Sequence, residues 1–284
     1  MIEFDRSLCA FICGYLLTSS GSLVQFTTAN PLASPSTLGI HALCLLHYMI
    51  SFFMLKALSL DISLEILTTL SSFMYIVPLL IYKKEKKYYS NSFDLGTQKV
   101  ILLGLCFNLL VGALFSVLQF LMMAFRLDFP SSIWFGSFKW VPQYIIIPLV
   151  LFFITSLFFF SYFKRTINFL QLGPEYFRIH FPKTSFFRFI AIYLLFSSFI
   201  TIPYFGIFSF VGLLIPQIIR GLNLFDTYYK ELIFGSFLGG GSFLVLDLIC
   251  YHFLIGHAEL PLGMITAVLG SLLFMTISIK DHKV

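Results

Sequence analysis

Long apolar stretches dominate this sequence and restrict the folds that it can adopt. One of them, YIIIPLVLFFITSLFFFSYF at residues 144–163, contains no charged side chain. A helix needs about 20 apolar residues to cross the hydrocarbon core of a bilayer, whereas the strands of a membrane β-barrel alternate apolar and polar residues. Only 11% of the residues are charged, against about 25% in an ordinary soluble domain. The sequence therefore predicts an all-α, polytopic bundle of membrane-spanning helices.

Apolar periodicity predicts nine spanning helices, which form a single membrane domain over residues 1–284. The expected spans are residues 7–26, 38–56, 63–82, 98–123, 141–163, 186–203, 206–220, 232–254 and 262–279. The span at 206–220 is short and contains Pro216. Proline is tolerated in a spanning helix where neighbouring groups satisfy the freed backbone.

The basic residues indicate how these helices are oriented. Cytoplasmic loops carry an excess of Lys and Arg, so the run KKEKK at residues 83–87 marks the cytoplasmic side. Alternation of the spans then places 14 of the 18 basic residues on that side, and Arg6 and Lys139 among the few outside. Met1 also falls outside, and the start MIEFDR is not the basic start of a signal peptide. A further helix before the first span is therefore expected, and this chain does not encode it.

Three other features of the sequence carry little functional information. The five cysteines lie in apolar segments without close C-x-x-C spacing, which is typical of small buried hydrophobic residues and not of metal ligands or disulfides. His41 and His47 lie six residues apart, which is not the spacing of a metal pair on one helix face. A haem or iron ligand is one interpretation of them, and a hydrogen-bonded core histidine is the favoured one. A net charge of +5 does not indicate nucleic-acid binding in a membrane chain.

Three stretches carry a resemblance to a known family. They are GSLVQFTTANPLASPSTLGI (21–40), FGIFSFVGLLIPQIIR (205–220) and AELPLGMITAVLGSLLF (258–274). In order and spacing they resemble the permease subunits of ABC importers for iron siderophores, haem and vitamin B12, and WFGSF (134–138) and NFLQLG (168–173) resemble further landmarks of that family. The residues that match the signature or line the pathway are Gln25, Asn30, Pro31, Leu32, Pro35, Gly39, Gly212, Pro216, Gln217 and Arg220.

The resemblance implies a bacterial plasma- or inner-membrane protein with the ten-helix family fold, here without its first helix. It implies a homodimer, or a heterodimer with a second permease, around a pathway for an iron chelate such as a ferric siderophore or haem. An external substrate-binding lipoprotein would deliver the cargo. The chain has no G-x-x-x-x-G-K-[ST] phosphate loop, so separate cytoplasmic ATPase subunits would hydrolyse ATP. The protein is expected to be a transport subunit, not an enzyme, and to need no cofactor.

The cytoplasmic segment 164–185 is the expected contact with the ATPase. Pro after Gly suits a helix start, and an acidic residue in the first turn favours the helix dipole. Aromatic residues are enriched at interfaces. The resemblance implies that this stretch is the coupling helix, with the residues Leu172, Gly173, Pro174, Glu175, Tyr176 and Phe177. The alternative is an interfacial loop that only covers the bundle.

Two charged residues have alternative interpretations. Arg6 resembles one of the arginines that dock the external binding protein, although Glu3 and Tyr251 stand where the family pattern has or often has basic residues. Alternatively, Arg6 only snorkels at a helix end. Asp247 lies inside a span. In a generic transporter it would be a proton or ion site, but the resemblance favours a structural polar contact.

Other classes of function stay open at this stage. An ion-driven secondary transporter would need inverted repeats and broken helices, which are not evident. A cobalamin or metal-ion ABC permease is closer, although the NPLASP and FVGLLIPQ stretches fit the zinc and manganese type poorly. A membrane-embedded enzyme lacks support, because neither H-E-x-x-H nor G-x-S-x-G occurs in the sequence. The glycine- and serine-rich runs at 14–22 and 235–242 suit either pathway lining or close helix packing.

Overall fold

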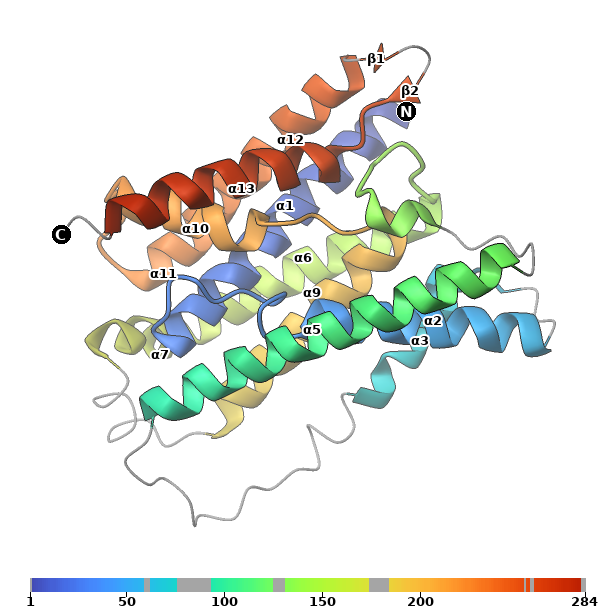
Figure 1. The fold of residues 1–284 in the computed structure, drawn as a ribbon. Helices are drawn as coiled ribbons and strands as arrows, with labels where there is room; N and C mark the ends of the chain where they lie inside the picture. Colours follow the sequence, from blue (N-terminus) through green and yellow to red (C-terminus); the bar gives the residue numbers. More distant parts are fainter. Residues whose placement is uncertain are drawn as a thin grey trace.

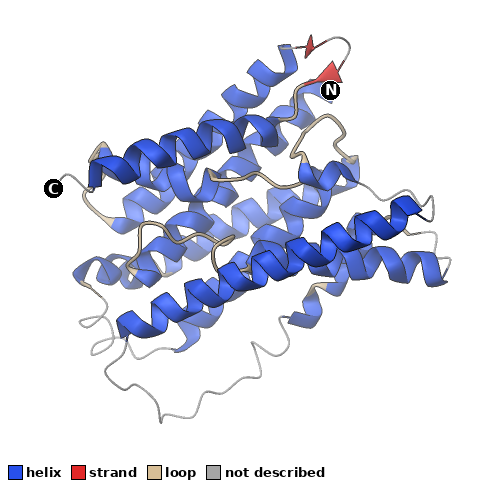
Figure 2. Cartoon of the chain, viewed as in Figure 1, coloured by secondary structure: helices blue, strands red, loops and turns tan. Residues whose placement is uncertain are grey.

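The computed structural model describes residues 2–58, 62–75, 93–124, 131–173, 184–252, 254–255 and 258–281. Helices make up almost all of the elements in these ranges (Figure 2). The α-helices are α1 (Ile2–Thr28), α2 (Ile40–Leu58), α3 (Leu64–Ser71), α5 (Phe93–Ala124), α6 (Gln143–Tyr162), α7 (Lys164–Phe169), α9 (Thr184–Phe205), α10 (Val211–Gly221), α11 (Tyr228–Lys230), α12 (Ser236–His252) and α13 (Leu262–Asp281). Short 3-10 helices η1 (Ser131–Trp134) and η2 (Leu170–Leu172), a π-helical turn η3 (Glu231–Gly235) and one hairpin of β1 (Leu254–Ile255) and β2 (Ala258–Glu259) complete the fold. The predicted all-α class is confirmed.

Five of the described helical segments are long and apolar enough to cross a membrane. They are Phe4–Thr28, Ile101–Ala124, Gln143–Tyr162, Phe186–Phe205 and Tyr228–His252. Shorter apolar helices cover Ile40–Lys56, Val211–Gly221 and Leu262–Thr276. The predicted span at 63–82 extends past residue 75 into a stretch outside the described residues. The predicted count of nine spans is therefore not confirmed, although the chain is a multi-pass membrane protein.

The prediction of one spanning helix over residues 206–220 is wrong, because the helix begins only at Val211. The chain leaves α9 at Phe205, is extended over residues 206–210, and becomes helical only in α10. The 11 residues of α10 rise about 16 Å, which is roughly half of the 30 Å hydrocarbon core. Gly206 and Phe210, at the two ends of the extended segment, both have positive φ, of 83° and 64°. Hydropathy alone could not separate this interrupted helix from a short complete span.

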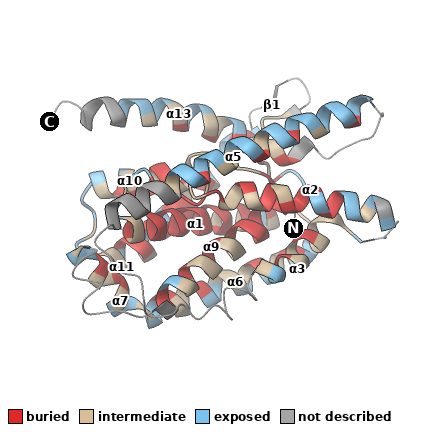
Figure 3. Ribbon diagram, turned by 60° about the horizontal axis from the view of Figure 1, so that its bottom comes forward, coloured by how far each residue is buried: buried red, intermediate tan, exposed pale blue. Residues whose placement is uncertain are grey.

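Helix α1 forms the centre of the bundle. It packs against α12, α10, α6 and α9, and 83% of its apolar window is buried, against 17% in α5. Figure 3 shows the same contrast, with α1 among the buried residues and α5 exposed along the rim. Within α1, the Oγ of Ser19 lies 2.6 Å from the hydroxyl of Tyr193, and the Oγ of Ser20 lies 2.9 Å from that of Ser197. The small residues of α1 thus pack and hydrogen-bond inside the core.

Glycines allow the closest helix crossings. A Cβ added to Gly21 of α1 would lie 1.6 Å from the carbonyl oxygen of Gly212 in α10, and one added to Gly239 of α12 would lie 2.1 Å from the Oγ1 of Thr18. No side chain larger than hydrogen fits at these crossings without displacing backbone or a buried hydroxyl. The close approach that small residues permit is therefore what holds α10 and α12 against α1.

A second glycine cluster joins three landmark segments near the β1–β2 hairpin; we call Gly136, Gly206 and Gly263 the glycine junction. The N–H of Gly263 donates to the carbonyl of Gly136 at 2.7 Å. The N–H of Ser137 donates to Phe205 at 2.8 Å, and that of Ile207 donates to Ile133 at 2.9 Å. These bonds satisfy non-helical backbone within protein, as a membrane requires, and they set where the extended segment before α10 begins.

Candidate functional site

The stretch NPLASPSTLG folds as a compact chain of turns between α1 and α2. The carboxamide Oδ1 of Asn30 accepts the N–H of Leu32 at 2.8 Å, and the carbonyl of Asn30 accepts the N–H of Ala33. Thr37 and Ser34 exchange side-chain and backbone hydrogen bonds. Asn and Ser side chains that bond their own backbone favour turns over helix. Gly39 then takes a φ of 80°, which glycine adopts without strain, and α2 begins at the next residue.

Two amide side chains from other helices hold the backbone of this loop, and a third joins α1 to α10 beside it. The Nε2 of Gln217 in α10 donates to the carbonyl of Pro31, and the Nδ2 of Asn108 in α5 donates to that of Ser36. The Nε2 of Gln25 in α1 donates to the carbonyl of Leu213 in α10 at 3.0 Å. We call the loop 30–39 with these amide side chains the NPLASP junction. The structure thus brings together two signature stretches through Gln217 and Pro31, which lie 186 residues apart in the sequence.

Within the loop, the signature residues differ in exposure. Pro31 and Leu32 are exposed, whereas Pro35 and Gly39 are buried. A Cβ added to Gly104 of α5 would lie 2.2 Å from the carbonyl oxygen of Thr37, so the loop lies directly against α5. The rim of the loop is therefore free at Pro31 and Leu32, while its second half is part of the packed bundle.

The end of α10 carries a buried ion pair. The Nε of Arg220 lies 3.1 Å from an Oε1 of Glu231 in the π-helical turn η3, and Glu231 is buried. The guanidinium also lies over the ring of Phe26, which stacks on Tyr228 at 4.0 Å between centroids. Pro216, one turn earlier, is buried inside α10, and its carbonyl faces the Nε of Arg220 at 3.3 Å. The Glu231 partner has no motif in the sequence, so sequence reasoning missed it.

The predicted ATPase-contact residues lie only partly within the described structure. Leu172 is exposed at the end of η2, and Gly173 has a φ of 95° with open space around its Cα. Pro174, Glu175, Tyr176 and Phe177 lie outside the described residues.

The helical start of the coupling segment is tied to the turn before α12. Asn168 in α7 accepts the N–H of Tyr229 at 2.9 Å, and the Nε2 of Gln171 donates to the carbonyl of Asp226 at 3.1 Å. The ammonium of Lys164 lies 5.0 Å from the Tyr229 ring centroid. This part of the segment is therefore joined to α11 and to the turn that precedes it.

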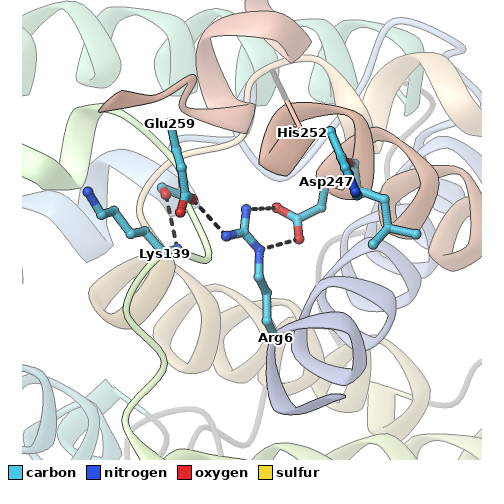
Figure 4. Close-up of polar contacts among 7 residues, drawn as sticks. Arg6, Lys139, Asp247, His252 and Glu259 are labelled. Atoms are coloured by element: carbon cyan, nitrogen blue, oxygen red, sulfur yellow. Dashed lines mark hydrogen bonds and ion pairs between the residues drawn. The ribbon is translucent and has the colours of Figure 1, made fainter. Parts of the chain in front are cut away.

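Arg6 is buried between two carboxylates of its own chain, as Figure 4 shows. Its Nε and Nη2 donate to the two oxygens of Asp247 at 2.7 and 2.9 Å, and its Nη1 donates to Glu259 at 2.7 Å. The ring of Tyr251 lies 4.9 Å from the guanidinium carbon. The structural contact expected for Asp247 is confirmed. Glu259 was not linked to Arg6 from the sequence, and docking of an external protein by Arg6 stays a prediction.

The histidines of α2 differ from one another. The Nε2 of His47 lies 2.7 Å from the Oγ of Ser71, and its Nδ1 lies 3.2 Å from the hydroxyl of Tyr75, as the favoured core interpretation requires. His41 instead lines a cavity of about 240 Å³ beside the NPLASP junction. Within the described residues, no three His, Cys, Asp or Glu side chains group in a way that could hold a metal ion.

Comparisons with known proteins place this geometry in a family. A sequence model of the FecCD transport family matches residues 1–280. The chain is 27% identical to the vitamin B12 import system permease protein BtuC of Photorhabdus laumondii, covering 98% of this chain and 81% of that protein. It is 25% identical to the hemin transport system permease protein HmuU of Yersinia pestis, covering 99% and 83%.

A solved structure described as a metal-chelate type ABC transporter in an inward-facing conformation has a similar fold. It superimposes with a TM-score of 0.71 at 23% identity, over 98% of this chain and 87% of that one. A second structure, PsaBC from Streptococcus pneumoniae in complex with Fab, reaches a TM-score of 0.54 at 15% identity.

Proposed function

The chain belongs to the FecCD transport family, and from this premise we propose that it imports an iron chelate, either a ferric siderophore or haem, as the permease subunit of an ABC importer. As a member of a transport family it is a permease subunit and not an enzyme. Two copies, or one copy and a second permease, would enclose the pathway. Cytoplasmic ATPase subunits would supply the energy, and an external lipoprotein would deliver the cargo.

The proposal rests on the contacts observed at the NPLASP junction. Two separated family stretches meet there through Gln217 and Pro31, and the loop is anchored to α5 through Asn108. In Figure 1 the loop after α1 and the extended segment before α10 lie between α5 and α13. Irregular backbone at membrane depth is tolerated where it is buried in protein or lines a cavity, which is what a translocation pathway would require here.

Coupling to ATP hydrolysis is assigned to the segment 164–185. Its described start is bonded to Tyr229 of α11 through Asn168 and to Asp226 of the preceding turn through Gln171, so a displacement of the segment would be passed first to α11. Leu172 is exposed and available to a partner. We propose that Gly173, Pro174, Glu175, Tyr176 and Phe177 continue this contact with the ATPase.

The cargo assignment rests on the family and on its relatives. The relatives named above include a hemin permease and a vitamin B12 permease, so cobalamin is the second candidate cargo. The iron chelate is preferred because the resemblance includes permeases for iron siderophores and for haem, and a hemin permease is among the relatives. An ion-driven transporter remains the alternative of another class.

Reconstitution in proteoliposomes with the partner ATPase and binding protein tests the proposal. We expect ATP-dependent uptake of hemin or of a ferric siderophore, with little uptake of cyanocobalamin. Leu172→Ala combined with Phe177→Ala should lower both ATPase association and uptake, while Leu222→Ala, an exposed residue of another loop, should not. Uptake that persists without the ATPase and collapses with the proton gradient would show a secondary transporter instead.

A further inference from the structure

A cavity of about 240 Å³ lies next to the NPLASP junction and has no assigned role. Part of its wall is the loop around Ser36 and Thr37, and part is the first turn of α2 with His41. The extended segment before α10 closes the other side. The apolar part of the wall consists of Leu17, Ile207, Phe208, Phe210 and Leu213.

The extended segment presents backbone donors that the protein does not satisfy. In the ranges that the structure describes, the N–H groups of residues 208–210 have neither a backbone nor a side-chain acceptor. An unsatisfied backbone group within a membrane bundle is costly, and every such group needs a partner from protein, water or ligand. The carbonyls of Phe208 and Ser209 accept no hydrogen bond from the described residues either, so the segment leaves both donors and acceptors unpaired beside the cavity.

Two side chains add to these unpaired groups. His41 and Ser209 line the cavity, and neither has a hydrogen-bond partner among the described residues. The hydroxyl of Ser209 can donate and accept, and an imidazole always carries at least one N–H. The hydroxyl of Thr37, by contrast, donates to the carbonyl of Ser34. His41 and Ser209 are thus the side chains of the cavity that have no partner among the described residues, and each can donate a hydrogen bond.

We propose that this cavity is a cargo subsite in which the side chains of His41 and Ser209 bind a carboxylate of the transported chelate. The inference rests on the proposed function and narrows its cargo to carboxylate-bearing chelates. A carboxylate accepts several hydrogen bonds and carries no donor when ionised, so both side chains can donate to it. Hydrogen bonds to an ionised acceptor are also stronger than neutral ones.

The size of the cavity limits what it can hold. Pockets for whole drug-sized ligands measure about 300–1,000 Å³, so about 240 Å³ admits one carboxylate arm and not an entire chelate. Phe208 and Phe210 offer aromatic surface to the adjoining carbon skeleton. The rest of the cargo would occupy the space between α5 and α13.

Uptake of matched cargo pairs tests the subsite in the assembled transporter. One pair is hemin and hemin dimethyl ester, which differ only in the two carboxylates. The other is ferric citrate and ferrioxamine B, a carboxylate and a hydroxamate chelate. For each variant, uptake of the carboxylate-bearing member of a pair is divided by uptake of the other member, and this ratio is compared with the wild-type ratio. Because the binding protein is the same in both transporters, its own preference for one cargo does not affect the comparison.

We expect His41→Ala and Ser209→Ala each to lower this ratio about tenfold, the effect of losing one hydrogen bond to a charged group. A fall for the hemin pair alone identifies a tetrapyrrole carboxylate, and a fall for the citrate pair alone identifies a carboxylate siderophore. His252→Ala and Ser116→Ala are the matched controls, because these exposed residues bond only their own helices, and their ratios should not change.

Two outcomes would overturn the subsite while leaving the proposed function intact. One is an unchanged ratio in both variants. The other is an equal fall in uptake of both members of each pair, which would indicate a structural role. Absence of ATP-dependent uptake of every iron chelate would instead contradict the proposed function.

A labelling measurement tests carboxylate binding in the cavity without measuring transport. Ser209→Cys, made in a Cys106→Ser background because Cys106 is the exposed native cysteine among those described, is treated with a sulfonate-bearing methanethiosulfonate reagent. Hemin should slow the modification, hemin dimethyl ester should not, and adding His41→Ala should remove the protection. Equal protection by both compounds, or none by either, would refute carboxylate binding at this site. Lys139→Cys, at an exposed loop residue that does not line the cavity, serves as the unprotected control.

Discussion

Arg6 lies inside the bundle with its counter-charges supplied by its own chain. The guanidinium makes a two-pronged contact with Asp247 and a third hydrogen bond to Glu259. A buried charge is tolerated only when it is paired and hydrogen-bonded. These contacts join the start of α1 to α12 and to the hairpin before α13. An external partner that uses Arg6 would therefore have to compete with two internal carboxylates.

Removal of Arg6 is predicted to destabilise the fold strongly. Arg6→Ala would leave Asp247 buried and unpaired, which costs about 3–5 kcal/mol in comparable buried pairs. Thermal unfolding of the detergent-solubilised protein, followed by tryptophan fluorescence, should show a clearly lower Tm. Arg6 and Lys139 line one small cavity, and Lys139 is exposed. Lys139→Ala should therefore leave the Tm almost unchanged. Arg6→Met combined with Asp247→Leu should recover much of the loss, and equal Tm values for Arg6→Ala and Lys139→Ala would contradict this role.

At the scale of elements, the position of α10 depends on backbone contact with α1. Gly21 and Gly212 face one another so closely that a Cβ on Gly21 would overlap a carbonyl oxygen. Gln25, one turn further along α1, donates to the carbonyl of Leu213. Because a carbonyl oxygen cannot rotate away as a side chain can, any larger residue must separate the two helices. The location of the NPLASP junction follows from this crossing.

A pair of glycine substitutions tests the crossing. Gly21→Ala should destabilise the protein by about 1–3 kcal/mol through overpacking. Gly112→Ala, in α5 with open space where its Cβ would lie, should be neutral or stabilise by up to about 1 kcal/mol, because alanine is the better helix former. Chemical or thermal unfolding of both variants measures the difference. Similar stabilities would mean that α1 and α10 do not touch as closely as described.

At the scale of the whole molecule, the landmark stretches meet at two places along the bundle. The glycine junction joins Gly136, Gly206 and Gly263 beside the hairpin, and the NPLASP junction lies further along α10. The exposed faces of α5 and α13 flank the segment between them (Figure 1). These apolar faces can contact lipid, and in the proposed assembly part of them would contact the second permease.

The orientation of the bundle can be tested by cysteine accessibility. With Cys106→Ser as background, Ser137→Cys should react with a membrane-impermeant maleimide in intact cells, since the positive-inside rule places its loop outside. Thr227→Cys, in the loop between α10 and α11, should react only after permeabilisation. The opposite pattern would invert the proposed topology and would place segment 164–185 away from any cytoplasmic ATPase.

The sequence by itself determined the all-α membrane class, the family and the approximate positions of most described helices, but not the number of spans. A bilayer forces each span to be apolar over its own length, so hydropathy is a local signal, and the signature stretches are contiguous. The broken span at 206–220 escaped this reasoning, because a five-residue extended segment is as apolar as a helix.

Only the tertiary structure decided which residues meet. Arg6 and Asp247 lie 241 residues apart and Gln217 and Pro31 lie 186 apart, and no local pattern encodes such pairs. The cavity arises in the same way, because His41 and residues 207–210 lie far apart in the sequence and line it together only in the folded bundle. Bilayer solvation acts on each segment separately, whereas packing acts on pairs of segments, and it is packing that creates the sites.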